Sequence, residues 1–190
     1  MITKEDAIKI LESSYILNPG PWKEHSYVVA RCAYIIAKNC NLDENKAYIY
    51  GLLHDIGRRF GITYLKHTID GYDYCLYLGI SEAARICLTH SFADKDLNSY
   101  IGMHDVTHDE KMRIKSLLDS FQYDDYDRLI QVCDALALPT GPVDMIIRME
   151  DVKSRYGYYP IAKWNKHLEL KEYFEKKLGM DLTSFISKYY

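Results

Sequence analysis

The sequence lacks several features that would place it in a specialised class of protein. No apolar run approaches the roughly 20 residues needed to cross a bilayer, and residues 1–6 are charged rather than typical of a signal peptide. The formal net charge is only −3 over 190 residues, so no broad basic surface is available for nucleic acid. These absences predict a cytoplasmic protein that has neither a membrane nor a nucleic acid as its partner.

The cysteines form no recognisable framework either. They are Cys32, Cys40, Cys75, Cys87 and Cys133, and no two of them make a C-x-x-C pair. An odd number without such pairs is typical of neither a disulfide scaffold nor a zinc knuckle. Because four of them fall inside predicted helices, we expect small core residues in a reducing compartment.

Strand-like alternation is also missing, and helical periodicity fills most of the chain. Helices are predicted over residues 3–17, 25–39, 43–57, 66–78, 81–90, 109–121, 127–138, 143–156, 162–178 and 182–190. The polar stretch 91–108 is predicted to be a long loop of the kind that often forms a lid or a binding segment. The fold class is therefore all-α: one compact helical domain over residues 1–190, with the last helices packed around the rest.

Four polar residues interrupt the apolar faces of these helices. They are His25, the adjacent pair His54-Asp55 in the apolar run Tyr50-Gly-Leu-Leu-His-Asp-Ile-Gly57, and Asp134. Burying imidazole and carboxylate groups is costly unless they are paired, and a divalent metal ion binds both. A core histidine bonded to a carbonyl, or a carboxylate paired with an arginine, is the alternative at each position. Taken together, the four positions favour a metal site.

Two more histidines follow the same pattern, because His67 begins one predicted helix and His90 ends the apolar face of another. Six protein ligands are enough for two ions. Two ions sharing Asp55 would activate water and stabilise both the attacking and the leaving oxygen in a phosphoryl transfer. The ligand types do not identify the metal, since iron, manganese, magnesium, cobalt, nickel and zinc are all compatible with them.

Arg58 and Arg59 directly follow the predicted helix that carries the His-Asp pair. One of them is positioned to bind a phosphate through its planar guanidinium group; the alternative is an exposed arginine near a helix C-terminus. We assign a catalytic role to Arg58, together with Asp55. A second dipeptide, His104-Asp105, lies in a polar stretch, and we attribute it to solvation.

The ligands occur in the order H…HD…D, which resembles the HD superfamily of metal-dependent phosphohydrolases. The surrounding segments, His25-Ser-Tyr-Val-Val-Ala-Arg31 and Gly51-Leu-Leu-His-Asp-Ile-Gly-Arg58, are similar to those of the family as well. The resemblance covers about residues 22–138. It implies a helical HD-type core and hydrolysis of a phosphate ester or anhydride by metal-activated water.

His67 and His90 resemble additional ligands of one branch, the symmetrical bis(5′-nucleosyl)-tetraphosphatases, which hold a dinuclear and often iron-containing centre. The resemblance implies that both histidines bind a second ion, with iron as the expected metal. After the last ligand the sequence reads Asp134-Ala-Leu-Ala-Leu-Pro139, where that branch has a Tyr-Ile-Glu-Pro stretch. The resemblance therefore extends to a two-metal HD protein and does not carry over the substrate.

We expect a small phosphorylated substrate, in particular a nucleotide. The competing hypothesis is a non-catalytic module on the same fold that binds metal and nucleotide without turnover. The sequence leaves a homo-oligomer open.

Overall fold

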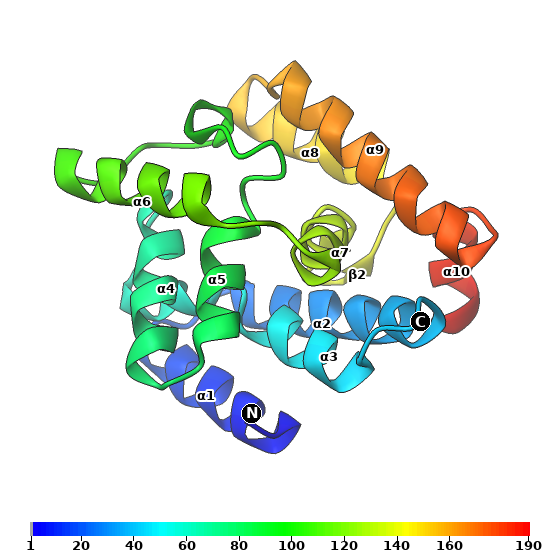
Figure 1. Ribbon diagram of the computed structural model, residues 1–190, viewed down its shortest axis with the longest axis horizontal. Helices are drawn as coiled ribbons and strands as arrows, with labels where there is room; N and C mark the ends of the chain where they lie inside the picture. The colour runs from blue at the N-terminus through cyan, green and yellow to red at the C-terminus, as the bar shows by residue number, and fades with distance from the viewer. Residues whose placement is uncertain (1) are drawn as a thin grey trace.

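The computed structural model describes residues 2–190, and ten α-helices account for most of that part of the chain (Figure 1). They are α1 (Lys4–Leu17), α2 (Trp22–Asn39), α3 (Glu44–Leu53), α4 (Lys66–Tyr77), α5 (Ser81–Thr89), α6 (His108–Ser120), α7 (Asp125–Asp134), α8 (Met145–Tyr156), α9 (Ile161–Leu178) and α10 (Leu182–Tyr189). Two short 3₁₀ helices cover Ile56–Phe60 and Leu97–Ser99, and two-residue strands cover Ala137–Leu138 (β1) and Gly141–Pro142 (β2). The predicted all-α fold class is confirmed.

Several helix ends follow directly from the sequence. Thr3 forms a capping box with Asp6 at the start of α1, and the Asp43 side chain accepts two backbone N–H groups at the start of α3. Gly157 ends α8 with φ of 78°, a left-handed conformation that glycine adopts without a Cβ clash. At the start of α5, by contrast, Ile80 occupies the N-cap position and makes no side-chain bond.

The helices surround α7, which is seen nearly end-on at the centre of Figure 1. Helix α2 packs against both α3 and α7, and α4 packs against α5. The C-terminal helices cover the other side, with α9 on α7 and α10 on α9. The ends of α2, α3, α5 and α7 therefore lie close to the face that α8 and α9 cover.

Two predicted helices end earlier than expected. The helix predicted over 43–57 ends at Leu53, and a 3₁₀ helix replaces its last turn. The helix predicted over 127–138 ends at Asp134 and is followed by the antiparallel β1–β2 pair. Pro139 favours this early end because proline restricts the residue before it to extended conformations, and Gly141 adopts a φ of +138° in the hairpin.

Gly57 permits a close contact rather than ending a helix as predicted. A Cβ atom at this position would lie 1.9 Å from the carbonyl oxygen of His67 and 2.6 Å from the backbone nitrogen of Gly71. The absence of a side chain therefore lets the 3₁₀ helix rest directly on the first turns of α4. Gly71 also permits a close helix approach, since a Cβ there would lie 3.1 Å from that of Cys87.

The segment 91–108, predicted to be a long loop, is fixed in place by buried side chains and hydrogen bonds. Phe92, Leu97 and Tyr100 are buried in a second apolar cluster with residues of α4, α5 and α6. The Asp105 carboxylate accepts hydrogen bonds from the backbone nitrogens of Tyr64, at 2.7 Å, and Lys66, at 2.9 Å. Our attribution of Asp105 to solvation is therefore wrong, because this side chain caps the start of α4.

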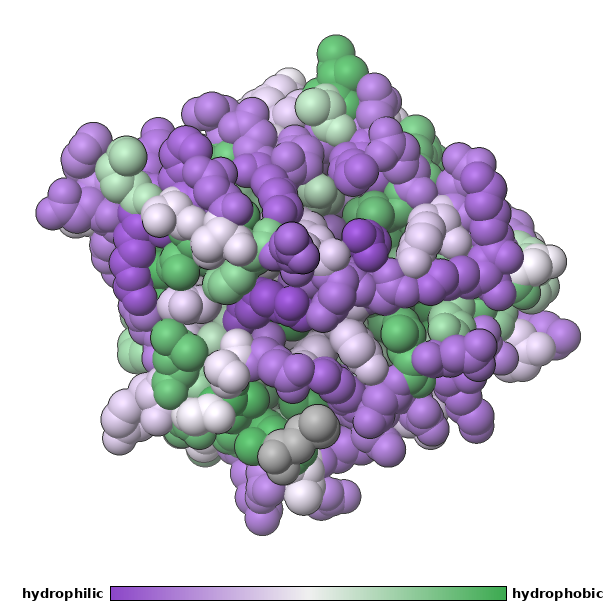
Figure 2. All heavy atoms as spheres, viewed as in Figure 1, coloured by the Kyte–Doolittle hydropathy of each residue, from purple (hydrophilic) through white to green (hydrophobic). Residues whose placement is uncertain are grey.

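The cysteines and the surface agree with a folded helical protein. All five cysteines are buried and unbridged. Within residues 2–190, no helix combines the length and apolar character needed to span a membrane. The face shown in Figure 2 is mostly hydrophilic, with apolar side chains in separate small patches.

Replacing Gly57 with alanine is expected to destabilise the protein by about 3 kcal/mol, because the added methyl group meets backbone atoms that cannot rotate away. The control is Gly79→Ala, where nothing lies within 4 Å but φ is +74°; the expected cost there is about 1 kcal/mol. Urea unfolding of both variants measures the difference. Equal stability of the two variants would contradict the close-contact role of Gly57.

Candidate metal centre

All six predicted ligands lie at helix ends. His25 and His67 belong to the first turns of α2 and α4, and Asp134 is the last residue of α7. The pair His54-Asp55 directly follows α3, and His90 directly follows α5. Five of the six are buried, and the Asp134 side chain is 30% exposed. The break in the helix after Leu53 lets neighbouring residues 54 and 55 face one site, which a continuous helix would hinder.

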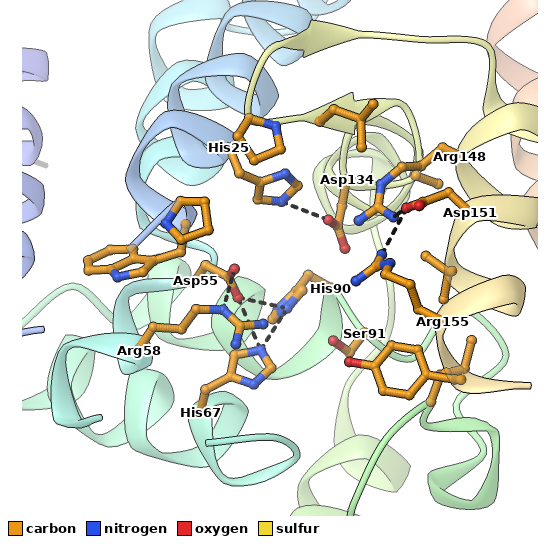
Figure 3. A pocket seen from close by; sticks show the side chains of 18 of the residues that line it. His25, Asp55, Arg58, His67, His90, Ser91, Asp134, Arg148, Asp151 and Arg155 are labelled. Carbon is orange, nitrogen blue, oxygen red and sulfur yellow. Dashed lines mark hydrogen bonds and ion pairs between the residues drawn. The ribbon is translucent and has the colours of Figure 1, made fainter. Parts of the chain in front are cut away.

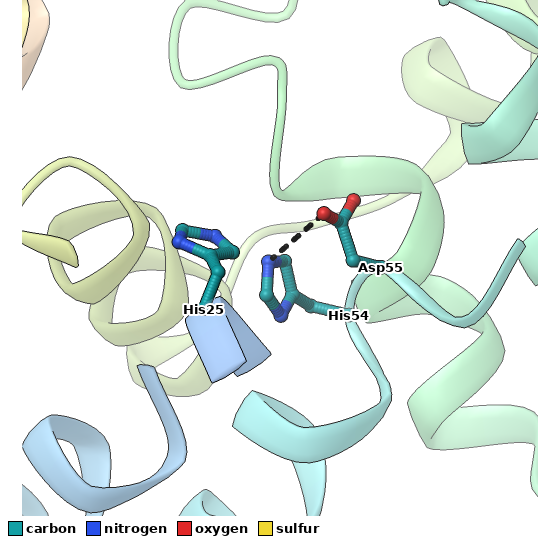
Figure 4. A group of neighbouring side chains, drawn as sticks. All are labelled: His25, His54 and Asp55. Carbon is teal, nitrogen blue, oxygen red and sulfur yellow. Dashed lines mark ion pairs between the residues drawn. The ribbon is translucent and has the colours of Figure 1, made fainter. Parts of the chain in front are cut away.

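The structure brings these six side chains into one cluster (Figures 3 and 4). Asp55 is central: its Oδ1 lies 3.1 Å from His67 Nε2 and 3.6 Å from His90 Nε2, and its Oδ2 lies 3.9 Å from His54 Nε2. At the other side, His25 Nε2 lies 3.0 Å from Asp134 Oδ1. The same Asp134 oxygen is 4.0 Å from His54 Nε2, which links the two sides.

Backbone carbonyls fix the tautomer of three of the histidines. His54 Nδ1 donates to the carbonyl of Gly51 at 2.8 Å, His90 Nδ1 donates to that of Cys87 at 2.8 Å, and His67 Nδ1 donates to that of Tyr64. A carbonyl only accepts, so each Nδ1 carries the proton and each neutral ring presents an unprotonated Nε2 to the cluster. This arrangement is the usual second contact of a metal-binding histidine.

The cluster is left short of positive charge at its centre. His67 Nε2 and His90 Nε2 lie 3.2 Å apart, so two lone pairs face each other. His54 Nε2 and Asp55 Oδ1 are buried with no hydrogen-bond partner among the described residues, an arrangement that is costly unless a cation is bound. Three overlapping groups have geometry suited to a metal ion: His25/His54/Asp55, His54/His90/Asp134 and Asp55/His67/His90. The residues therefore fit a divalent metal, and Asp55 belongs to two of the groups.

The carboxylates of the cluster are ionised. Burial alone would raise the pKa of Asp55, but the Arg58 guanidinium, which donates to it at 2.6 Å, holds the pKa well below its usual range. For Asp134, burial is likewise outweighed by His25 and His54, which lower the pKa. Two carboxylates thus remain charged, which is the state in which they can bind a metal.

The structure distinguishes between the two candidate arginines. Arg58 Nε donates to Asp55 Oδ2 at 2.6 Å, and its side chain lines the central cavity. Arg59 instead stacks on Tyr74, with its guanidinium carbon 3.8 Å from the ring centre. Lys66, which adjoins His67, is paired with acidic side chains of α4 and α6 rather than facing the cavity.

A cavity of about 720 Å³ opens over the cluster, and several of its lining residues were not predicted from the sequence. They are Tyr100 from the 91–108 loop, Arg148 and Arg155 from α8, and Lys163 and His167 from α9. A sequence signal existed for the last two. Lys163, His167, Leu170 and Phe174 form the buried stripe of α9, so two ionisable residues interrupt an apolar helix face, as His25 does in α2.

The buried histidines predict a loss of stability in acid. Burial, with His54 nearby, lowers the pKa of His90 to about 3, whereas an unfolded histidine titrates near 6.5. Between these values the unfolded state binds more protons, so the metal-free protein becomes less stable as pH falls below 6.5. We expect His90 to contribute about 2 kcal/mol of this loss between pH 6.5 and pH 5. Urea unfolding in EDTA should show a smaller loss for His90→Gln, and an unchanged loss would contradict the assignment.

Comparisons with known proteins place the chain in a family. A model of the HD domain family matches residues 22–138, a segment that contains six of the α-helices in full together with all six clustered side chains. No curated protein and no solved structure matches the chain. The family match does not single out the tetraphosphatase branch or any other. HD domains are generally metal-dependent phosphohydrolases, and by the extent of this match the chain belongs to the HD domain family.

Proposed function

We propose that this protein hydrolyses a phosphate ester or anhydride of a nucleotide or a related small molecule. The observation that carries the proposal is the set of unprotonated Nε2 atoms that converge on the Asp55 and Asp134 carboxylates beneath a large cavity. A small phosphorylated molecule suits such a site, because a cavity of about 720 Å³ is in the size range of small-molecule pockets.

The proposed site holds two divalent ions. The ligands would be His25, His54, Asp55, His67, His90 and Asp134, with Asp55 shared between the ions, as its place in two of the suitable groups supports. We propose iron, since imidazole-rich sites favour such transition metals over magnesium. Bound ions of this kind polarise a phosphoryl oxygen and lower the pKa of water to near neutrality.

Arg58 has two proposed roles. Its pairing with Asp55 favours the ionised carboxylate, and its guanidinium group also faces the cavity. A guanidinium has five N–H donors; Nε is used by Asp55, and Nη1 makes only a long 3.4 Å contact with the carbonyl of Thr63. The remaining donors are free to bind the oxygens of a substrate phosphate and to orient it.

The same pairing supports the alternative of a binding module without turnover. Arg58 already neutralises part of the charge of Asp55, at a separation of 2.6 Å, and this weakens the attraction of that carboxylate for an ion. A module of this kind would bind metal and nucleotide without releasing phosphate. Turnover assays of the metal-loaded protein therefore decide between the two functions.

Elemental analysis of the purified protein tests the number of ions. We expect about two metal ions per chain in the wild type and about one in His67→Gln, because His67 belongs to only one of the three suitable groups. His108→Gln, at the exposed start of α6, is the matched control and should retain both ions. A wild-type protein without bound metal after reconstitution with iron or manganese would refute the site.

Asp55→Asn tests the enzymatic function. The substitution keeps the size of the side chain but removes a charge that two of the groups share, so metal-dependent phosphate release should fall by at least about 100-fold. Asp119→Ala, which removes an exposed carboxylate on α6, should retain full activity. Screening nucleotides with manganese, iron, cobalt and magnesium is the measurement. The hydrolase proposal fails if the wild type releases no phosphate under any of these conditions.

A further inference from the structure

The wall of the cavity opposite the Asp55 side of the cluster is positively charged. In Figure 3, Arg148 and Arg155 lie beside Asp134 and His90, on the side of the cavity away from Asp55. Both arginines bind the same carboxylate: Arg148 Nη1 lies 2.9 Å and Arg155 Nη2 lies 3.0 Å from Asp151 Oδ2. Lys163 of α9 adds a third cation to the lining. Three positive charges against one carboxylate leave this wall with a formal excess of two.

Lys163 is the most informative member of this wall. The residue is only 7% exposed, and it forms no ion pair with any acidic side chain in residues 2–190. Its Nζ donates to the carbonyl of Ser91 at 2.8 Å. An ammonium group has three N–H donors, so two remain for a ligand in the cavity. A buried cation without a counter-ion is costly, and an anionic ligand would remove that cost.

The protonation of Lys163 and the unused donors of the neighbouring arginines also favour an anionic ligand at this wall. Burial lowers the pKa of Lys163 to about 8, although Asp134 and Asp94 oppose the shift, so the side chain is still mostly protonated at neutral pH. Arg155 has a side chain that is 51% exposed, and it uses one nitrogen on Asp151. Arg148 is more constrained, since its Nε also donates to the carbonyl of Ala137. Lys163 and Arg155 are thus the cations with donors to spare.

We propose that Lys163 and Arg155 form a second phosphate-binding subsite, so that the substrate carries at least one phosphate group besides the one bound at the metal centre. The inference rests on the proposed function for the identity of the reacting group. Ser91, which Lys163 contacts, directly follows the cluster residue His90. A ligand held by Lys163 therefore lies beside the metal centre, as the phosphates of one polyphosphate chain would.

Binding measurements test this subsite without requiring turnover. The probes are adenosine 5′-monothiophosphate and α,β-methylene ADP, which resist hydrolysis and carry one and two phosphorus groups. Calorimetry with the manganese-loaded wild type should show tighter binding of the second probe. Lys163→Met should weaken the binding of α,β-methylene ADP at least tenfold while changing that of the monothiophosphate by less than threefold. Arg155→Gln, at a half-exposed position, should have the same effect as Lys163→Met: it should weaken the binding of α,β-methylene ADP more than that of the monothiophosphate.

Matched controls separate charge from structure. Lys166→Met lies one turn further along α9, where the lysine is 40% exposed and paired with Glu169, and it should change neither affinity. Lys163→Arg keeps the charge and should restore most of the affinity that Lys163→Met loses. Metal content should stay at the wild-type value in every variant.

Three results would overturn the subsite: equal binding of the two probes by the wild type, no binding of either, or an equal loss of both in Lys163→Met. The last result would show that the lysine only anchors the Ser91 loop. Absence of phosphate release with selective, Lys163-dependent binding of α,β-methylene ADP would refute the hydrolase function and leave the subsite standing.

Discussion

The arrangement of the site depends on one constraint. Six clustered His and Asp side chains bring lone pairs and negative charges together, and these repel one another unless a cation lies among them. Carbonyls at the ends of α3 and α5, and the carbonyl just before α4, hold the protonated Nδ1 atoms of three histidines. Each Nε2 lone pair must then face the Asp55 and Asp134 carboxylates. Such a concentration of buried acceptors is costly unless a cation compensates them. At the ends of α3 and α5 these hydrogen bonds also satisfy the carbonyls of Gly51 and Cys87, so helix termination and histidine orientation are linked there.

The close approach at Gly57 serves the same centre. The 3₁₀ helix that follows Asp55 rests on the turn that carries His67, with the Gly57 backbone against the His67 carbonyl. A larger residue would move Asp55 away from His67, whose atoms now lie 3.1 Å apart. Asp105 also fixes the start of α4, which carries His67, by accepting a hydrogen bond from the backbone nitrogen of Lys66. The positions of two ligands are therefore set by backbone contacts that involve no ligand side chain.

The C-terminal helices complete the cavity. The family match ends at residue 138, and the cationic wall comes from α8 and α9, beyond that point. Phosphate binding needs positive charge, whereas the metal ligands supply negative charge and lone pairs. The two halves of the cavity thus have complementary electrostatics.

Local sequence patterns were sufficient to predict the all-α fold, most helix ends and the six residues that cluster, because apolar periodicity and buried polar interruptions are readable along one chain. They could not reveal the early end of α3, since proximity to α4 decides it, whereas the early end of α7 reflects both Pro139 and the β1–β2 turn. Nor could they assign Asp105 to the start of α4, because that pairing depends on which segments lie side by side; Arg58 and Asp55 are only three residues apart, but the 3₁₀ turn that brings them together appears only in the structure. Lys163 shows the difference between what the sequence predicts and what only the packing decides. Its place on the apolar stripe of α9 was visible in the sequence, but only the packing of α9 over α7 placed its unpaired charge beside the metal centre.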